Sequence, residues 1–506
     1  MPDIGRVKDN VTVRLGFDRL EQLFFCAVAL GSLVSLYRAE NIASLPYEVN
    51  FEEGPLATVS EGITRGAALY PIPNILPYEL NPYGPIAYYL IALPIKLFGL
   101  SFTPARLLIA LSGLACALTI ALLLRHWTGS LLTGAVFGAV FLTMPAVMQW
   151  LPILRVDLIG LMFSLLGIYV FTTWKRWYVS IVFFVAALLC KFLFLSAPAA
   201  CFLAMLVKGD WKRAIKFAGT FVGLAGAIVL YWQHQSHGWF AFHTLWIQAH
   251  HPFRLVFAVP SVAKELRDNV LLLLVTVLAV ALSSRRPRQL SQLRQLGQLR
   301  QAAVLPAIYF MTSFAIMFAR GKAGADSNYY LEWEAALCLC AGVSYTVLRG
   351  ESRRLGMRLR FVLPVLLACA AWGSVLWTIH HRDPLKLVSL EQCGDAYQFV
   401  NEHAGDRILS DNIGAVFMAR KHPLVSDPFM WGQEVMGGRW SDTQILRLIR
   451  SRQIDLIVLN GKLEELRDDP ANRWPHSVLD AISSNYILRK TYTCGEAEAA
   501  YEPATP

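Results

Sequence analysis

Three carboxylates stand at the ends of apolar stretches, where a charged side chain is costly and usually has a task. Glu52 and Glu53 follow the first apolar stretch, and Asp157 opens a later one. Counting the stretches between them predicts that all three lie on the same side of a membrane. A positioned carboxylate can take a proton from an incoming hydroxyl and contributes roughly 10²–10⁴-fold in rate. We expect Glu52, and after it Glu53, to act as such a base, with Asp157 orienting the molecule that reacts. For Asp157, helix capping or an ion pair with Arg155 is the alternative.

Cations predicted on the same side could stabilise negative charge that accumulates on a departing group. The candidates are Arg155, Lys191, Arg254, Arg320 and Lys322. Lys191 interrupts a long apolar stretch, so its ammonium is costly unless it meets a counter-charge, which a phosphate would supply. The alternative is that Lys191 extends to the membrane surface and keeps its charge in water.

A short polar segment, 320–330, precedes another apolar stretch and combines small residues, two cations and hydrogen-bonding side chains. We expect its Asp326, Asn328 and Tyr329 to contact a phosphate or a sugar. An ordinary glycine-rich loop with an Asn cap is the alternative interpretation.

The elements that must position these residues are membrane helices. Of the 506 residues, 55% are hydrophobic and 16% are charged, and the mean hydropathy is +0.43, which excludes an ordinary soluble protein. Stretches near the ~20 residues that span a bilayer as a helix occur at 21–38, 104–124, 130–150, 155–174, 213–232, 269–284, 302–319, 331–348 and 361–380. The longer stretch 177–207 is interrupted at Lys191 and predicts two short helices. The sequence therefore predicts an all-α polytopic membrane protein with about eleven transmembrane helices.

The distribution of Lys and Arg predicts the orientation, because short basic loops stay cytoplasmic. It favours a cytoplasmic N-terminus, a membrane domain at 1–381 and a first external loop at 39–103, provided that 86–99 does not cross fully. The net charge of +10 is then mainly a topology signal and gives no reason to expect nucleic acid as a partner. We expect a bacterial inner (plasma) membrane, whose lipids surround the chain.

The tail at 382–506 is richer in charge, and its apolar runs are short. Two segments, 407–411 and 454–459, have the pattern of buried strands. Two others, 395–403 and 442–451, have the pattern of amphipathic helices. We expect a small α/β extracytoplasmic domain on the periplasmic side. Cys393 and Cys494 could form a disulfide, because the periplasm is an oxidising compartment. Their spacing in the sequence does not decide whether they do.

The order of several motifs carries a family resemblance. The acidic pair is followed by a Pro-rich stretch, which comprises Tyr70-Pro71-Ile72-Pro73 and Asn81-Pro82-Tyr83-Gly84-Pro85 and leads into aromatic residues. Arg155-Val156-Asp157 comes later, at the start of a predicted helix. Over 20–380, this order and the topology resemble the GT-C fold glycosyltransferases. The most similar members are the dolichyl-phosphate-mannose protein mannosyltransferases and the bacterial lipid A aminoarabinose transferase.

The resemblance implies an enzyme, an inverting glycosyltransferase. It would move a sugar from a polyprenyl-phosphate carrier to a hydroxyl of a lipid, glycan or protein acceptor on the outer face. The family's first-loop pair is usually Asp-Glu, so Glu52-Glu53 lengthens one arm by a methylene and leaves open which residue is the base. Asp157 matches the later family carboxylate. Family members often carry a basic residue near the Pro-rich stretch; this chain has none around Tyr83, which we expect to contact substrate, so phosphate binding must come from elsewhere.

A divalent cation could bind at Glu52, Glu53 and Asp157, although a monophosphate leaving group does not demand one. The sequence has no Walker loop, dinucleotide fingerprint or nucleophile elbow, which agrees with a lipid-linked donor. One rival is a transporter or flippase of lipid-linked sugars, which favours charges at mid-helix. The other is a non-catalytic membrane scaffold whose external domain binds a partner.

Overall fold

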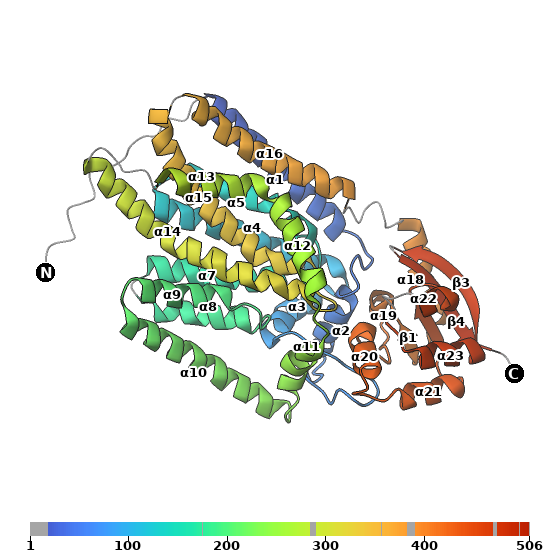
Figure 1. Cartoon of the computed structure of the whole chain (residues 1–506). Helices are drawn as coiled ribbons and strands as arrows, with labels where there is room; N and C mark the ends of the chain where they lie inside the picture. The colour runs from blue at the N-terminus through green and yellow to red at the C-terminus, as the bar shows by residue number, and fades with distance from the viewer. Residues whose placement is uncertain are drawn as a thin grey trace.

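The computed structural model describes residues 19–174, 176–283, 290–355, 357–381, 390–468, 473–494 and 496–504. Figure 1 shows a helical bundle with a C-terminal region, which we define as residues 390–504, against one end. The bundle contains α1 (Arg19–Ala43), α3 (Pro85–Phe98), α4 (Phe102–Thr128), α5 (Leu131–Leu142), α7 (Asp157–Thr173), α8 (Tyr178–Leu188), α9 (Ser196–Val207), α10 (Trp211–Gln235), α13 (Val270–Ser283), α14 (Leu290–Met317), α15 (Leu331–Leu355) and α16 (Met357–His381). Shorter elements connect these helices, namely α2 (Glu53–Thr64), α6 (Pro145–Trp150), the π-helix η2 (Phe242–Trp246), α11 (Ile247–His250), α12 (Leu255–Asp268) and the 3₁₀ helices η3 (Phe318–Gly321) and η4 (Ser327–Tyr330).

The lengths and composition of the helices are those of a multi-pass integral membrane protein. Among the described residues, six helices are long and apolar enough to cross a bilayer, namely Glu21–Ala43, Phe102–Thr128, Trp211–Gln235, Ala303–Gly321, Ser327–Arg349 and Val362–His381. Shorter apolar helices accompany them, including α3, α5, α7, α8 and α9. The all-α membrane architecture is thus confirmed, while the number of eleven crossings stays a prediction.

The chain breaks between α8 and α9, at the interruption that the sequence predicted around Lys191. This loop receives the segment that leads into α3: the Gly84 N–H donates to the Cys190 carbonyl at 3.1 Å, and the Ile86 N–H donates to the Leu189 carbonyl at 3.2 Å. A Cβ at Gly84 would lie 1.9 Å from the Leu189 oxygen, so only glycine permits this approach. The contact brings the Pro-rich stretch of the first loop beside Lys191.

A second break, between α5 and α6, is stabilised by a buried carboxylate. Glu334 on α15 is fully buried, and its two oxygens accept hydrogen bonds from the Ala146 N–H at 3.0 Å and the Val147 N–H at 3.1 Å. Glu334 thereby satisfies backbone donors that the start of α6 would leave unpaired. This contact fixes the segment that ends at Trp150, just before Arg155.

The C-terminal region mixes helices with one small sheet. Its elements are α18 (Leu390–His403), β1 (Ile408–Ser410), α19 (Ile413–Met418), α20 (Pro428–Met436), α21 (Thr443–Arg450), β2 (Leu456–Leu459), α22 (Leu463–Asp468), α23 (His476–Asn485), β3 (Tyr486–Cys494) and β4 (Glu496–Pro503). The sheet order is β1-β2-β4-β3, with β1 parallel to β2 and the other pairs antiparallel. The two predicted strands and two predicted helices are confirmed as β1, β2, α18 and α21, whereas the β3–β4 hairpin was not predicted.

A disulfide joins Cys393 on α18 to Cys494 at the end of β3, which answers the question that their spacing left open. The bond fastens the first helix of the C-terminal region to its last hairpin. The expected domain boundary after residue 381 adjoins 382–389, which lie outside the described residues, so this boundary stays a prediction.

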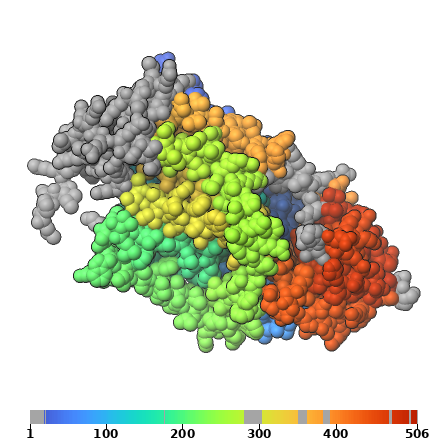
Figure 2. Space-filling view, viewed as in Figure 1, coloured from blue at the N-terminus to red at the C-terminus, as the bar shows by residue number. Residues whose placement is uncertain are grey.

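The C-terminal region packs directly on the first loop. The Tyr78 N–H donates to the Leu424 carbonyl and the Ser426 N–H donates to the Tyr78 carbonyl, both at 2.9 Å, so that Tyr78 and Val425 form a parallel β-bridge. Helix α19 lies against α2. In Figure 2, α12 extends along the bundle as far as the C-terminal region, which covers the same end of the bundle. The predicted site lies where these parts meet.

Candidate active site at the junction of the first loop and the bundle

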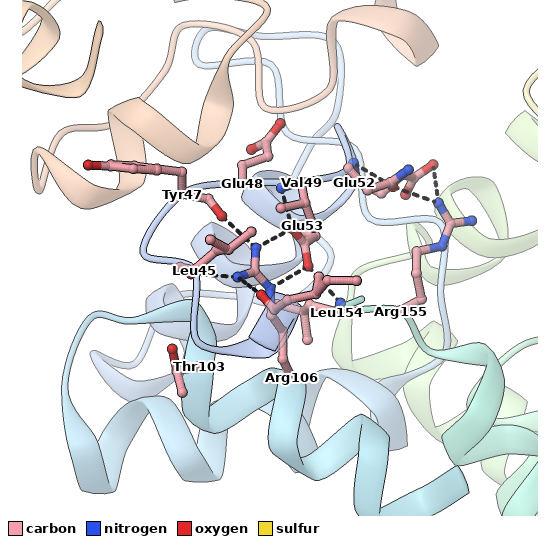
Figure 3. A network of polar contacts seen from close by, with 12 residues as sticks. Leu45, Tyr47, Glu48, Val49, Glu52, Glu53, Thr103, Arg106, Leu154 and Arg155 are labelled. Atoms are coloured by element: carbon pink, nitrogen blue, oxygen red, sulfur yellow. Dashed lines mark hydrogen bonds and ion pairs between the residues drawn. The ribbon is translucent and has the colours of Figure 1, made fainter. Parts of the chain in front are cut away.

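Glu53, the first residue of α2, has hydrogen-bond or ion-pair partners for both of its carboxylate oxygens. Its carboxylate forms a fully buried, two-bond ion pair with Arg106 on α4, with Nε–Oε1 at 2.8 Å and Nη2–Oε2 at 2.6 Å (Figure 3). The same carboxylate also accepts the Leu154 N–H at 2.7 Å and the Val49 N–H at 2.8 Å. Arg106 in turn donates to backbone carbonyls of the first loop, including that of Leu45 at 2.6 Å. Glu53 therefore ties the first loop to α4 and to the segment before α7.

Glu52 is the neighbouring acid but has far fewer partners. Its Oε2 accepts the Tyr83 hydroxyl at 3.0 Å. Its Oε1 lies 3.6 Å from Nη1 of Arg155 (Figure 3). The residue is 7% exposed. Burial and the nearby negative charges of Glu52 and Asp157 raise the pKa of the Tyr83 phenol, although the Arg155 charge acts against this, so Tyr83 stays a proton donor toward Glu52. A carboxylate with one loosely paired oxygen can still accept a proton.

Asp157, the first residue of α7, contacts two groups from distant parts of the chain and the nearby Arg155. Its Oδ1 accepts Lys191 Nζ at 2.8 Å and Asn328 Nδ2 at 3.0 Å, while its Oδ2 lies 3.6 Å from Arg155 Nε. The Lys191 ammonium also lies 4.4 Å from the centre of the Tyr329 ring, within the range of a cation–π contact. The predicted site residues Arg155, Asp157, Lys191, Asn328 and Tyr329 therefore meet in one cluster.

Several buried polar atoms of this cluster have no hydrogen-bond partner among the described residues. They are Arg155 Nε, Asp157 Oδ2 and Asn328 Oδ1. Buried polar groups are ordinarily hydrogen-bonded, and each such exception needs an explanation. A polar ligand that both accepts and donates hydrogen bonds would satisfy these atoms.

The remaining predicted residues lie at the margin of the cluster and are more exposed. Arg320 Nη2 lies 3.7 Å from Asp326 Oδ1, and these side chains are 30% and 47% exposed. Lys322 donates to the Gln248 carbonyl at 3.2 Å. Partial burial, and after it the charge of Lys191, lower the pKa of Lys322, so the two ammonium groups lie within electrostatic range.

Sequence reasoning missed three charged residues near the first loop, of which Arg106 and Asp427 are buried and Arg473 is partly buried. Arg106 was hidden inside an apolar helix and is the counter-charge of Glu53. Arg473 and Asp427 come from the C-terminal region: the Arg473 guanidinium lies 4.8 Å from the centre of the Phe51 ring, and Asp427 is 3% exposed. A charge near the start of a 27-residue apolar helix was a usable signal for Arg106. No local pattern marks Asp427 or Arg473, because they reach the site only through tertiary packing.

The three acids do not suit a divalent cation. Glu53 is saturated by Arg106 and backbone donors, and Asp157 is paired with Lys191 and Arg155. Glu52 also faces Arg155. A metal ion would have to displace guanidinium and ammonium groups from these acids, and the described residues contain no group of three or more suitable ligands elsewhere.

Comparisons with known proteins agree with this architecture. Residues 81–234 match the family model described as dolichyl-phosphate-mannose-protein mannosyltransferase. The sequence matches no curated protein. The fold is similar to crystal structures of ArnT from Cupriavidus metallidurans, bound to undecaprenyl phosphate and in the apo state, each with a TM-score of 0.63 and 15% identity over 94% of this chain and 97% of that one.

A second similarity is to the archaeal oligosaccharyltransferase AglB from Archaeoglobus fulgidus, solved with an inhibitory peptide and a dolichol-phosphate. The TM-score is 0.56 at 11% identity, over 96% of this chain and 75% of that one. The resemblance that the motif order predicted is thus confirmed, and the chain has the GT-C fold of membrane glycosyltransferases.

Proposed function

We propose that this protein is an inverting glycosyltransferase that moves a sugar from a polyprenyl-phosphate carrier to an acceptor hydroxyl. The observation that carries the proposal is the pairing of two kinds of group at one membrane edge. Glu52 is a carboxylate with spare accepting capacity, and the buried Arg155 lies beside it. Arg155 is joined through Asp157 to the ammonium of Lys191, whose side chain is 12% exposed. The ArnT structure with the same fold holds undecaprenyl phosphate, and the AglB structure holds a dolichol-phosphate, which supports a lipid-linked donor.

The step we propose is a single displacement. The acceptor hydroxyl gives its proton to Glu52 while its oxygen bonds to the anomeric carbon, and the bond from that carbon to the phosphate oxygen breaks. One displacement of this kind inverts the configuration at the anomeric carbon. Glu53 is not the base in this scheme, because its oxygens are already engaged by Arg106 and by backbone N–H groups; it is a positioning residue for α2.

The leaving phosphate gains negative charge as the bond breaks, so cations near it stabilise the transition state. Lys191 and Arg155 are the inner pair, and Asp157 holds both in place. Arg320 and Lys322 lie farther out and would guide the phosphate. Tyr83, Asp326, Asn328 and Tyr329 are proposed to contact the sugar or the acceptor, and the unpaired Oδ1 of Asn328 can accept a sugar hydroxyl.

The orientation of the protein in the membrane is the next part of the proposal. We propose that the site and the C-terminal region face the periplasm of a bacterium, with the N-terminus in the cytoplasm and the membrane domain ending near residue 381. Two observations support this orientation. The distribution of Lys and Arg favours it, and the Cys393–Cys494 disulfide suits an oxidising compartment.

The experiment is transfer of radiolabelled sugar from a panel of synthetic polyprenyl-phosphate sugars by the purified full-length protein in detergent, with crude membrane acceptors. Wild type should form a labelled product, and the Glu52→Gln variant should lose roughly 10²–10⁴-fold in rate. A matched control is Glu40→Gln, which changes an exposed acid on α1 and should leave the rate unchanged. Donor binding without transfer from any sugar in the panel would overturn the proposal and favour a transporter.

A further inference from the structure

A polar cavity of about 350 Å³ opens in the C-terminal region. None of its lining residues belongs to the proposed active site. Its volume lies within the ~300–1,000 Å³ of small-molecule sites in proteins. The charged and aromatic residues of the lining are Asp395, Lys462, Glu465, Lys490, Tyr492 and Glu498. The cavity is therefore a candidate for a second binding site, of polar character.

The small sheet itself produces this cavity. Strand β2 ends at Leu459, which pairs with Ala499, whereas β4 begins at Glu496 and so extends past the end of β2. The chain turns away at Gly461, whose φ of +125° suits glycine. Helix α18 packs on the sheet face that carries Val458, and α22 packs on the opposite face, which carries Leu459. The shorter β2 thus leaves a notch in the sheet between two helices.

Tyr492 on β3 lines the cavity with a phenol that lacks a partner. The residue is 8% exposed, and its hydroxyl has no hydrogen-bond partner in the described part of the chain. Glu498 on β4 is its cross-strand neighbour, and Asn412 donates to Glu498 Oε1 at 2.8 Å. The Lys490 ammonium lies 5.4 Å from the centre of the Phe399 ring and 6.0 Å from that of Tyr492. Buried hydroxyls are ordinarily hydrogen-bonded, and a polar ligand in the cavity would satisfy this one.

The charges around the cavity are mixed in sign. Two lysines and three acids line it, and Thr491 and Thr493 add hydroxyl groups. A phosphate would meet the acids and an ammonium ligand would meet the lysines, and each contact between like charges is unfavourable. A sugar hydroxyl, in contrast, can donate to a carboxylate and accept from an ammonium or a phenol. The lining therefore suits a neutral ligand with many hydroxyl groups.

We propose that this cavity binds a neutral carbohydrate, which gives the C-terminal region a sugar-binding site of its own. The inference goes beyond the proposed function, since binding here needs no transfer. The wall of the cavity is fastened to the first loop, because the Tyr397 hydroxyl on α18 accepts the Glu48 N–H at 2.8 Å. A glycan held in the cavity therefore keeps a fixed position relative to the loop that carries Glu52.

Direct binding tests the proposal without any sugar donor. The full-length protein is purified in a detergent without sugar head groups and studied by isothermal titration calorimetry. The probes are neutral disaccharides and trisaccharides of glucose, mannose, galactose or N-acetylglucosamine, with inorganic phosphate as the charged comparison. We expect saturable binding of at least one of these sugars to wild type.

Two substitutions locate the bound sugar. Tyr492→Phe removes one neutral hydrogen bond and should weaken binding roughly 2- to 12-fold. Ala497→Trp, at an exposed position of the lining, fills the cavity and should abolish binding. The matched controls are Tyr501→Phe, whose hydroxyl accepts the Leu463 N–H, and Ile487→Trp at an exposed position of β3. Neither control residue lines the cavity, so both variants should bind sugar as wild type does.

Thermal unfolding shows whether each variant is folded and also tests the premise. Tyr492→Phe should keep the Tm of wild type, because the hydroxyl that it removes has no partner among the described residues. A clearly lower Tm would show that this hydroxyl is already engaged inside the protein, and would overturn its role in binding a ligand.

The remaining outcomes decide between ligand classes and sites. Lack of binding to every sugar of the panel would overturn the proposal, and so would sugar binding that Tyr492→Phe and Ala497→Trp leave unchanged. Phosphate binding that Ala497→Trp abolishes would overturn the choice of a neutral ligand. Glu52→Gln should bind the sugar as wild type does, so a failure of the proposed function and a failure of this site are distinguishable.

Discussion

Lys191 donates to Asp157 at 2.8 Å, although Asp157 begins α7 and Lys191 lies in the break between α8 and α9, 34 positions further along the chain. Each charge alone would be costly at the edge of an apolar helix, and together they offset this cost. The ammonium thus lies inside the protein, with a 12% exposed side chain, and does not extend into water as one interpretation of the sequence allowed. Because Asp157 also contacts Asn328 and Arg155, this ion pair organises the cationic side of the proposed site.

The two neighbouring glutamates should respond oppositely to the same substitution. Glu53→Gln leaves the buried Arg106 without its counter-charge and should cost about 3–5 kcal/mol of stability. Glu52→Gln removes only a long contact to Arg155 and retains an acceptor for Tyr83, so stability should change little while sugar transfer is lost. Thermal unfolding and transfer rates of the two variants distinguish these roles. Equal destabilisation by both would refute this division of tasks.

Lys191 should matter more than Lys322 for holding the lipid phosphate. Lys191→Met removes a charged donor from the buried cluster, which at roughly 1.5–3 kcal/mol corresponds to a loss of about 10- to 100-fold in affinity for undecaprenyl phosphate. Lys322→Met should cause a smaller loss, because Lys322 lies at the margin. Binding of labelled undecaprenyl phosphate to the purified variants measures both effects. Equal affinities of wild type and Lys191→Met would contradict the proposed phosphate site.

His243 should make the fold sensitive to acid. Its Nδ1 accepts the Asn81 N–H at 3.2 Å and its Nε2 donates to the Pro71 carbonyl at 2.8 Å, a pattern that requires the neutral ring. Burial lowers the pKa of His243 to about 4. The unfolded chain therefore binds a proton at higher pH than the folded chain does, and stability should fall from about pH 6.5 to about pH 4, by up to about 3 kcal/mol.

The measurement for His243 is the difference in Tm between about pH 7 and about pH 5, compared between wild type and His243→Gln. The variant should lose much of the acid sensitivity. His250→Gln is the control, since His250 is more exposed than His243 and its Nδ1 contacts the carbonyl of Trp246, four positions earlier, at 2.8 Å. An identical pH response of wild type and His243→Gln would show that other groups determine it.

Gly84 should be irreplaceable for a geometric reason. Alanine at this position would place its Cβ against the Leu189 carbonyl and push the first loop away from the Lys191 loop. We expect Gly84→Ala to reduce transfer by at least about tenfold, since small misplacements of substrate-positioning groups are costly. Gly219→Ala, in an open position on α10, should leave transfer unchanged. Full activity of Gly84→Ala would contradict the role of this contact.

The membrane architecture could be predicted from sequence because it depends on local properties. Apolar stretches of bilayer length, the interruption at Lys191 and the alternation of basic loops each follow from a few consecutive residues. The strands at 407–411 and 454–459 were predicted equally well for the same reason. The β3–β4 hairpin was missed because neither strand has a run of large apolar residues: β3 mixes buried and exposed positions without strict alternation, and the buried part of β4 is Glu498, Ala499, Ala500 and Tyr501.

The site could be predicted only in part. Residue type and position at helix ends were enough to select Glu52, Asp157, Arg155 and Lys191, since buried charge in a membrane protein is rare and therefore informative. The different environments of Glu52 and Glu53 could not be read from the sequence, because they depend on Arg106, which is 53 residues away in the chain. The packing of the segment before Asp427 on Tyr78 and Leu80 was likewise decided by the docking of the C-terminal region on the first loop. Such contacts join residues far apart in sequence, and only tertiary packing determines which charges meet.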